Sequence, residues 1–512
     1  MMSTQFDPST ALSRGQRTVL TLAVMLVAII EVLDMTIVNV ALPPMMGSLS
    51  ANSDQITWVL TSYIVSAAIF MPLTGFLVAR LGRKRLLLLN IMGFLLTSVL
   101  CGLAVNLLQM VVFRTLQGIF GAALVPLSQL ILNGAYPAEK RGQAMAIWGM
   151  GIMAAPVLGP TLGGYITDSL NWRWIFYLNV PVCLLAFFLC LRVVSETPTQ
   201  KQKIDWLGMF LMATGIGCLQ IFLDRGNGEN WFESKQITAY CIICLFCLGL
   251  FILRGLKKSD NIINLRIFAD RNFSSSCLLI TAYCASFFGI IALQSLMLEN
   301  LMNYPTVTAG ELMAPRGIAS FFSMALVANL ISRIDPRKII ALGLLLSLLG
   351  TYAMTYFSLN SSTWFIVWTS IVQGFGMGMF FVPLSTVAFN SLPKQQAAEA
   401  SGLFSFGRSL GQSIGISIYS TILSRENQTN WNRLVGHVNE FNPHFQAWLA
   451  KVQTLLPKPA IWQVLTGQIS KQAGMIAFID CYFAASLTIL ASFLLLLIMD
   501  KPKKVSTSLD IH

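Results

Sequence analysis

Apolar runs recur along the whole chain, and they constrain its fold more than any other feature of the sequence. A run of about 20 such residues is long enough to cross a bilayer as a helix. Of the 512 residues, 55% are hydrophobic and only 11% are charged, whereas a soluble chain carries about a quarter charged residues. The sequence therefore predicts an all-α membrane protein without a soluble domain of any size. Fourteen spans are predicted, at residues 18–42, 57–79, 86–105, 107–131, 145–167, 173–194, 205–223, 237–255, 273–298, 309–332, 338–357, 363–389, 402–424 and 475–498.

The basic residues alternate with the predicted spans. The net charge is +12, and most Lys and Arg residues lie in the N-terminal tail, the even-numbered connections and the C-terminal tail. This is the positive-inside pattern, which places both termini in the cytoplasm and requires an even number of spans. The positive charge is thus explained by membrane topology, and nucleic-acid binding is not expected. The first apolar run is too long for the core of a signal peptide, so we expect it to be retained as the first helix.

The chain contains an internal repeat. The stretch "LQGIFGAALVPLSQLILNGAYP" in the fourth span is similar to "VQGFGMGMFFVPLSTVAFNSLP" in the twelfth, and Gln117 corresponds to Gln373. Such repeats are typical of secondary transporters, which bind substrate between two halves. The repeat predicts two six-helix halves with two inserted helices. The expected parts are a cytoplasmic tail (1–17), a first half (18–194), an insertion with linkers (195–271), a second half (272–498) with an exterior loop at 425–474, and a cytoplasmic tail (499–512).

Two carboxylates, Glu31 and Asp34, lie three positions apart in the first apolar span. They share one helix face, and a charge near the bilayer centre costs roughly 2.5–3.5 kcal/mol on insertion scales. Two ionised acids there would repel each other, so at least one of the two is expected to bind a proton more tightly than an acid in water does. We interpret the pair as proton-coupling groups. The alternative is a structural ion pair of Asp34 with Arg114 or Arg316, and Arg114 fits both interpretations.

Other polar side chains inside the spans are candidates for a substrate cavity. Arg114 cannot neutralise itself, so it needs a partner, a cavity or an interface. Gln117 lies three positions further along the same span, and Arg316 lies in the tenth. Arg316 could instead reach the membrane surface with a long side chain. Arg408 lies near the start of the thirteenth span, where a structural role is the simpler explanation.

Glycine-rich stretches predict tight turns and close helix contacts. In "GFLVARLGRKRL", Gly75 precedes the turn, Gly82 permits it, and Arg83 and its basic neighbours lie at the level of lipid headgroups. In the fifth span, small residues four apart form a stripe that allows a second helix to approach closely. The residues singled out there are Gly159, Pro160, Gly163 and Gly164. The thirteenth span repeats the stripe at Gly407, Gly411 and Gly415.

In combination and in this order, these motifs resemble the major facilitator superfamily. "LDMTIVNVALP" and "GPTLGG" are similar to its fourteen-spanner drug:proton antiporters, the EmrB/QacA group, and "LDRGNGENWF", "RNFSSSC" and "EFNPHFQAW" look closest to the EmrB branch. The resemblance implies proton-driven export of amphipathic compounds across a Gram-negative inner membrane. It also implies a periplasmic adaptor and an outer-membrane channel as partners. One departure is Ala79, where the superfamily usually has an acid.

The exterior loop at 425–474 is far longer than the other exterior connections. Apolar residues recur in it at helical spacing up to Leu455 and Leu456, after which Pro457 and Pro459 interrupt the pattern. The first interpretation is a docking site for the adaptor, and the second is a helix lying in the membrane interface. The candidate contact residues are Phe445, Trp448, Leu449 and Trp462.

Other classes of protein are less consistent with the sequence. The three histidines lie outside the spans and no phosphate-binding GxxxxGK[ST] loop is present, so neither an enzyme nor an ATP-driven pump is expected. No pore loop or charged ring indicates a channel. Cys241, Cys244 and Cys247 are interpreted as apolar helix residues, and neither a metal nor a cofactor is expected beyond the use of a proton gradient. A closer alternative is an exporter dedicated to one metabolite, such as a siderophore or a fatty acid. The sequence does not indicate an oligomeric state.

Overall fold

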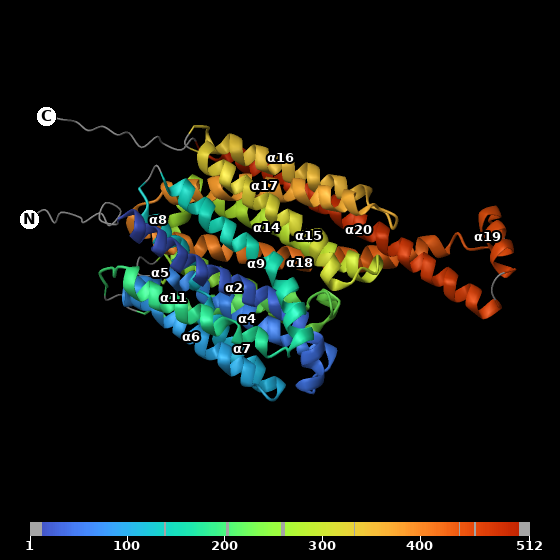
Figure 1. Ribbon diagram of the computed structural model, residues 1–512, viewed down its shortest axis with the longest axis horizontal. Coiled ribbons are helices and arrows are strands. Elements are labelled where there is room, and N and C mark those ends of the chain that lie inside the picture. Colours follow the sequence, from blue (N-terminus) through green and yellow to red (C-terminus); the bar gives the residue numbers. More distant parts are fainter. Residues whose placement is uncertain are drawn as a thin grey trace, which may run out of the picture.

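The computed structural model describes residues 13–137, 140–200, 204–257, 262–331, 333–439, 441–454 and 457–500. Within these ranges the chain is a bundle of long helices and contains no β-strand (Figure 1). Helix α2 begins and helix α20 ends at the same end of the bundle, which we call the terminal end. The opposite end carries α19. The all-α membrane fold expected from the apolar runs is confirmed.

The chain up to Val193 forms six long helical units, five of which are apolar enough to cross a membrane. Two of them are interrupted close to a proline, whose missing N–H and bulky ring break the helical hydrogen-bond pattern: one at Pro72 and the other just before Pro126. The helices are α2 (Arg14–Ser48), α3 (Ser53–Ile56), α4 (Trp58–Phe70), α5 (Thr74–Leu81), α6 (Arg83–Leu103), α7 (Leu107–Gly121), α8 (Leu124–Ala135), α9 (Arg141–Ser169), α10 (Trp174–Tyr177) and α11 (Asn179–Val193).

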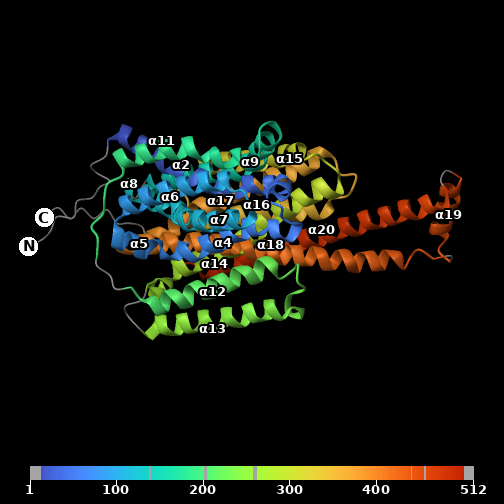
Figure 2. The same cartoon turned by 90° about the horizontal axis from the view of Figure 1, so that it is seen from below.

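The second half repeats the packing of the first. Helix α2 packs against α9 and α11, and its counterpart α14 packs against α18 and α20. The inserted helices pack against each other at one side of the bundle, where α12 also contacts α4 and α18 (Figure 2). The helices are α12 (Trp206–Arg225), α13 (Lys235–Lys257), α14 (Arg271–Leu296), α15 (Thr306–Leu330), α16 (Pro336–Ala353), α17 (Thr363–Asn390), α18 (Ala397–Val435), α19 (Pro443–Gln453) and α20 (Lys458–Ile498).

Eleven segments of the described chain are long and apolar enough to cross a membrane. Helices α9, α15 and α18 are not among them, and a count of fourteen spans fits once they are added. These three helices lie where the halves meet: α9 packs against α15, and α18 packs against α5 and α8. Because they contact other helices over much of their surface, they can carry more glycine, serine and charged residues than helices that face lipid.

The stretch at residues 425–474, which we predict to be an exterior loop, is largely helical in its described part. Helix α18 continues to Val435 and α20 already begins at Lys458. Together they form a hairpin that extends past the ends of the other helices and carries α19 at its tip (Figures 1 and 2). At about 1.5 Å per residue, the 39 residues of α18 span about 58 Å, roughly twice the thickness of a bilayer's hydrocarbon core.

The two halves contact each other at the terminal end. The Ser401 hydroxyl of α18 donates a hydrogen bond to the carbonyl of Pro126 in α8, at 2.7 Å. Arg141 of α9 donates to the Asn390 side chain of α17, at 3.2 Å. Glu399 in the first turn of α18 packs against Gly75 of α5 so closely that a Cβ at Gly75 would overlap with it. In this conformation the terminal end is therefore closed.

Candidate functional site

Asp34 lies fully buried in α2 at the centre of a polar cluster. Its Oδ2 accepts a hydrogen bond from Nη1 of Arg114 at 2.6 Å, and this contact is also an ion pair. Its Oδ1 accepts from the side-chain amides of Gln117 at 3.1 Å and of Asn179 at 2.7 Å. The partners lie on α7 and α11, so three helices of the first half meet at one carboxylate. Both oxygens of this carboxylate therefore accept hydrogen bonds from side chains inside the bundle.

Arg114 and Gln117 are held from several sides. They are three positions apart on α7, so they share a face, and Nη1 of Arg114 donates to Oε1 of Gln117 at 2.8 Å. Nε of Arg114 donates to the carbonyl of Val59, and the guanidinium lies over the ring of Tyr63, with Cζ 4.3 Å from its centre. Gln117 also donates to Ser98 at 2.8 Å. One atom, Nη2 of Arg114, is buried without a partner among the described residues.

Glu31 has a different environment from Asp34. It is only 2% exposed, and its Oε2 is buried without a hydrogen-bond partner in the part of the chain that the structure describes. Arg408 of α18 is the cation that acts on it electrostatically. Because α18 begins at Ala397, Arg408 lies more than two turns inside the helix. Glu31 therefore faces a charge in the other half of the protein.

The second half has a polar cluster of its own around Arg316. Arg316 of α15 is 4% exposed, so it does not reach the membrane surface. Its Nη2 donates to Oε1 of Gln294 on α14, and Ser370 of α17 lies 3.5 Å from the same atom. Gln373, the repeat counterpart of Gln117, donates to Thr351 at 3.1 Å instead. Among the described residues, this cluster contains an arginine and amides but no acid, in contrast to the cluster around Asp34.

The sequence-predicted candidates fall into two groups inside the bundle. Asp34, Arg114 and Gln117 come together in one hydrogen-bonded cluster, and Arg316 belongs to the separate cluster of the second half. Glu31 adjoins the first cluster through Tyr63, whose ring lies under the guanidinium of Arg114.

The glycine stripes lie where two helices approach closely. A Cβ at Gly159 or Gly163 of α9 would meet Thr36 and Ile37 of α2, whereas Gly164 faces Val40 at 4.0 Å. The side chain of Pro160 lies outside the described part of the structure. Gly411 and Gly415 of α18 lie against Thr281 and Ala285 of α14 in the same way.

The turn between α5 and α6 uses Gly82 in the left-handed region, with φ of 85°. The carboxylate of Glu196, which follows α11, accepts hydrogen bonds from the backbone N–H groups of Lys84 at 3.0 Å and Arg85 at 3.3 Å. It thereby caps the positive end of α6. Arg83 donates through Nη2 to the backbone and side chain of Ser195, at 3.1 and 3.0 Å. The guanidinium of Arg83 therefore binds another part of the protein, at Ser195.

The docking candidates lie on the hairpin. The rings of Phe445 and Trp448 in α19 are stacked with centres 6.3 Å apart, and Leu449 is half-buried beside them. Trp462 lies in α20 and is 55% exposed. Leu455 and Leu456 lie outside the described residues. Figure 2 shows that α19, which carries Phe445 and Trp448, lies beyond the ends of the other helices.

Sequence reasoning missed Ser98 and Asn179, which both bind the Asp34 cluster; Ser98 accepts from Asn179 at 3.0 Å. Asn179 could have been found by the rule used for the acids, because a polar residue at the start of an apolar span needs a buried partner. Gln294 and Ser370 could have been found by extending the internal repeat. Nothing in the sequence alone distinguishes Ser98 from other serines in spans.

The repeated packing of the helices and the buried polar clusters are typical of secondary transporters. The model of the Major Facilitator Superfamily matches residues 24–416. The chain is 35% identical to the multidrug export protein EmrB of Escherichia coli (strain K12) over 87% of each chain. It is 35% identical to the fatty acid resistance protein FarB of Neisseria gonorrhoeae over 91% of this chain and 93% of that protein.

The fold also matches the crystal structure of the human organic anion transporter MFSD10 (TETRAN). The TM-score is 0.62 at 15% identity, over 94% of this chain and 99% of that one. The chain therefore belongs to the Major Facilitator Superfamily, in the group that contains EmrB, and the expected likeness to EmrB is confirmed.

Proposed function

We propose that this protein exports amphipathic toxic compounds in exchange for protons. The observation that carries the proposal is the pair of buried acids on one face of α2, of which only Asp34 has a hydrogen-bonded counterion. The similarity to multidrug export proteins supports the substrate class. The action is transport, without a catalysed reaction, and it uses the proton gradient and no cofactor.

The two acids have different roles in this proposal. Neutralising Asp34 would leave Arg114 buried and unpaired, which typically costs about 3–5 kcal/mol. Glu31 has no such partner, and an isolated buried charge is costly. We therefore assign proton exchange first to Glu31. When Glu31 loses its proton, its charge attracts Arg408 in the other half, so the protonation state biases the relative position of the halves. Asp34 and Arg114 hold the helices of the first half in place around it.

Transport in inside-out membrane vesicles under an imposed pH gradient tests this assignment. Glu31→Gln should fold and insert but lose most gradient-driven export, because the amide cannot exchange a proton. Asp34→Asn should also lose export, with lower thermal stability in addition. Thr36→Ser, a conservative change on the same helix, is the control and should transport normally. Undiminished gradient-driven export by both acid variants would refute proton coupling through this pair.

A second candidate substrate class is supported by the similarity to FarB, which is named for fatty acid resistance. Arg114 and Arg316 have buried guanidinium nitrogens without partners among the described residues, and a carboxylate substrate could bind such atoms. Expression in a host that lacks its own pumps, challenged with cationic dyes and with long-chain fatty acids, separates the two classes. Resistance to fatty acids alone would indicate a dedicated exporter.

The proposed setting is a Gram-negative inner membrane, with both chain termini and the terminal end of the bundle in the cytoplasm. The hairpin of α18, α19 and α20 would then enter the periplasm. We propose that its tip binds a periplasmic adaptor that leads to an outer-membrane channel. The exposed Trp462 and the half-buried Phe445 and Trp448 support this, because aromatic anchors dominate many protein interfaces. The position of α19, past the ends of the other helices, argues against a helix lying in the membrane interface (Figure 1).

A further inference from the structure

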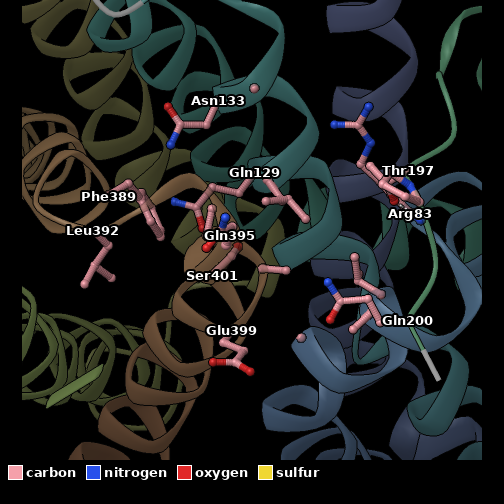
Figure 3. A pocket seen from close by; sticks show the side chains of 18 of the residues that line it. Arg83, Gln129, Asn133, Thr197, Gln200, Phe389, Leu392, Gln395, Glu399 and Ser401 are labelled. Carbon is pink, nitrogen blue, oxygen red and sulfur yellow. Dashed lines mark hydrogen bonds between the residues drawn. The ribbon is translucent and has the colours of Figure 1, made fainter. Parts of the chain in front are cut away.

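A cavity of about 620 Å³ lies between the two halves at the terminal end. Its volume is in the range of small-molecule sites. The first half contributes residues of α5, α6, α8, α9 and the segment after α11, and the second half contributes the end of α17 and the start of α18. The polar residues that face one another across it are labelled in Figure 3. This cavity is separate from the polar clusters around Asp34 and Arg316.

Three buried donors that line the cavity have no partner among the described residues. They are Nε of Arg83, Nε of Arg141 and Nε2 of Gln129. Gln129 is only 1% exposed. Buried donors are almost always satisfied, and leaving one unsatisfied costs about 1–3 kcal/mol. Three such groups around one cavity indicate a ligand with several acceptor atoms.

The charge of the lining indicates an anion. The lining residues include Arg83 and Arg141 as cations and Glu399 as the one acid. In Figure 3, Arg83 and Glu399 lie apart and do not point toward each other. Helix α18 begins at Ala397, which also lines the cavity, so the positive end of a 39-residue helix faces it. Arginine side chains and helix N-termini together are a typical environment for phosphate.

We propose that this cavity binds a phosphate-bearing anion that bridges the two halves. Arg83 and Arg141 belong to the first half and the start of α18 to the second, so the anion can contact all of them only while the terminal end is closed. Its binding therefore favours the closed arrangement over the open one. Ala79 also lines the cavity. A carboxylate introduced there would supply the negative charge from within the chain.

Thermal unfolding of the full-length protein in phosphatidylcholine nanodiscs tests the binding, with inorganic phosphate compared against chloride at equal ionic strength. Phosphate should raise the melting temperature of the unmodified protein. The rise should be lost in Arg141→Gln and in Gln129→Leu, which remove donors. It should also be lost in Ala79→Asp, which fills the site without removing a contact. Arg80→Gln, which removes an exposed charge from the same turn but does not line the cavity, should keep the full response.

A second arm distinguishes a lipid headgroup from a free ion. If the anion is a lipid headgroup, nanodiscs containing phosphatidylglycerol should raise the melting temperature by themselves and abolish the response to phosphate. If it is a free ion, the response should be the same in both lipids. Bridging of the two halves is measured as the distance between nitroxide labels at Leu81 and Pro393. This distance should become shorter when the anion binds.

The proposal is overturned if neither anion source has an effect, if the effect survives Ala79→Asp and Gln129→Leu, or if the distances do not change. None of these readouts depends on transport, so failure here leaves the proposed export function standing.

Discussion

At the scale of single residues, the buried charges of the first half depend on one another. Asp34 and Arg114 are both almost fully buried and neutralise each other, and removal of one partner leaves the other uncompensated. Sequence reasoning found both residues, because any charge inside an apolar span is conspicuous. It could not determine which acid has the arginine, since that depends on how α7 is rotated toward α2.

The first prediction concerns this ion pair. Arg114→Ala should destabilise the protein by about 3–5 kcal/mol and abolish transport, because Asp34 is left buried without its counterion. The double variant Asp34→Asn with Arg114→Gln should recover much of the stability but not transport, since the two neutral amides can bond each other. Thermal unfolding in nanodiscs and vesicle transport measure the two effects. Equal stability of the single and double variants would contradict the pairing.

The second prediction concerns Glu399, which lies in the first turn of α18 and precedes the span predicted at 402–424. Burial in the closed terminal end raises the pKa of its carboxyl. The closed terminal end is therefore most stable at a pH below the ordinary pKa of a glutamate, where Glu399 is protonated. It loses stability as the pH rises through the raised pKa of Glu399, because the buried carboxyl must then become charged. The charged groups lining the same cavity are Arg83 of α6 and Arg141 of α9, and α5 contributes Gly75 and α8 contributes Gln129.

Labels at Leu81 and Pro393 should accordingly move apart as the pH is raised. Glu399→Gln should remain closed over the same pH range, because the amide has no proton to lose. Replacement of the partly exposed Cys218 and Cys241 by serine keeps the labelling specific. A pH response that persists in Glu399→Gln would assign the effect to another group.

At the scale of helices, the two halves use the same packing device twice. The glycines of α9 lie against α2, and those of α18 lie against α14. The sequence predicted both stripes from the spacing of small residues. It did not predict how far α18 and α20 extend, because the residues after 424 are too polar for a span, and two polar helices can support each other in water.

The third prediction tests the second stripe. Gly415→Ala should destabilise the protein and reduce transport, because its Cβ would overlap with the backbone carbonyl of Ala285 and force α14 and α18 apart. Gly249→Ala in α13 is the matched control, since no atom lies within 4 Å of a Cβ there. It should be neutral or slightly stabilising, because alanine favours helices. Melting temperatures in nanodiscs give the comparison, and similar losses in both variants would contradict the prediction.

At the scale of the whole molecule, the proposed adaptor-binding tip and the proposed proton-coupling site lie apart. Its tip lies away from the helices that surround Asp34. The fourth prediction is that replacing residues 436–457 by a short polar linker leaves vesicle transport intact but abolishes adaptor co-purification and resistance in intact cells. Substitution of Phe445 and Trp448 by serine should have the same effect without shortening the chain. Adaptor binding that persists in both variants would exclude the tip as the dock.

Because α18 is long, a small rotation at one of its ends produces a large displacement at the other. Glu399 at its first turn belongs to the closed terminal end, Arg408 faces Glu31, and the far end of the same 39-residue helix supports the hairpin. A rod of about 58 Å that pivots by about 10° at one end moves its other end by about 10 Å. Rocking of the second half would therefore sweep the tip through a distance comparable to a helix diameter. If the proposed adaptor binds to that tip, each transport cycle would displace it by this distance.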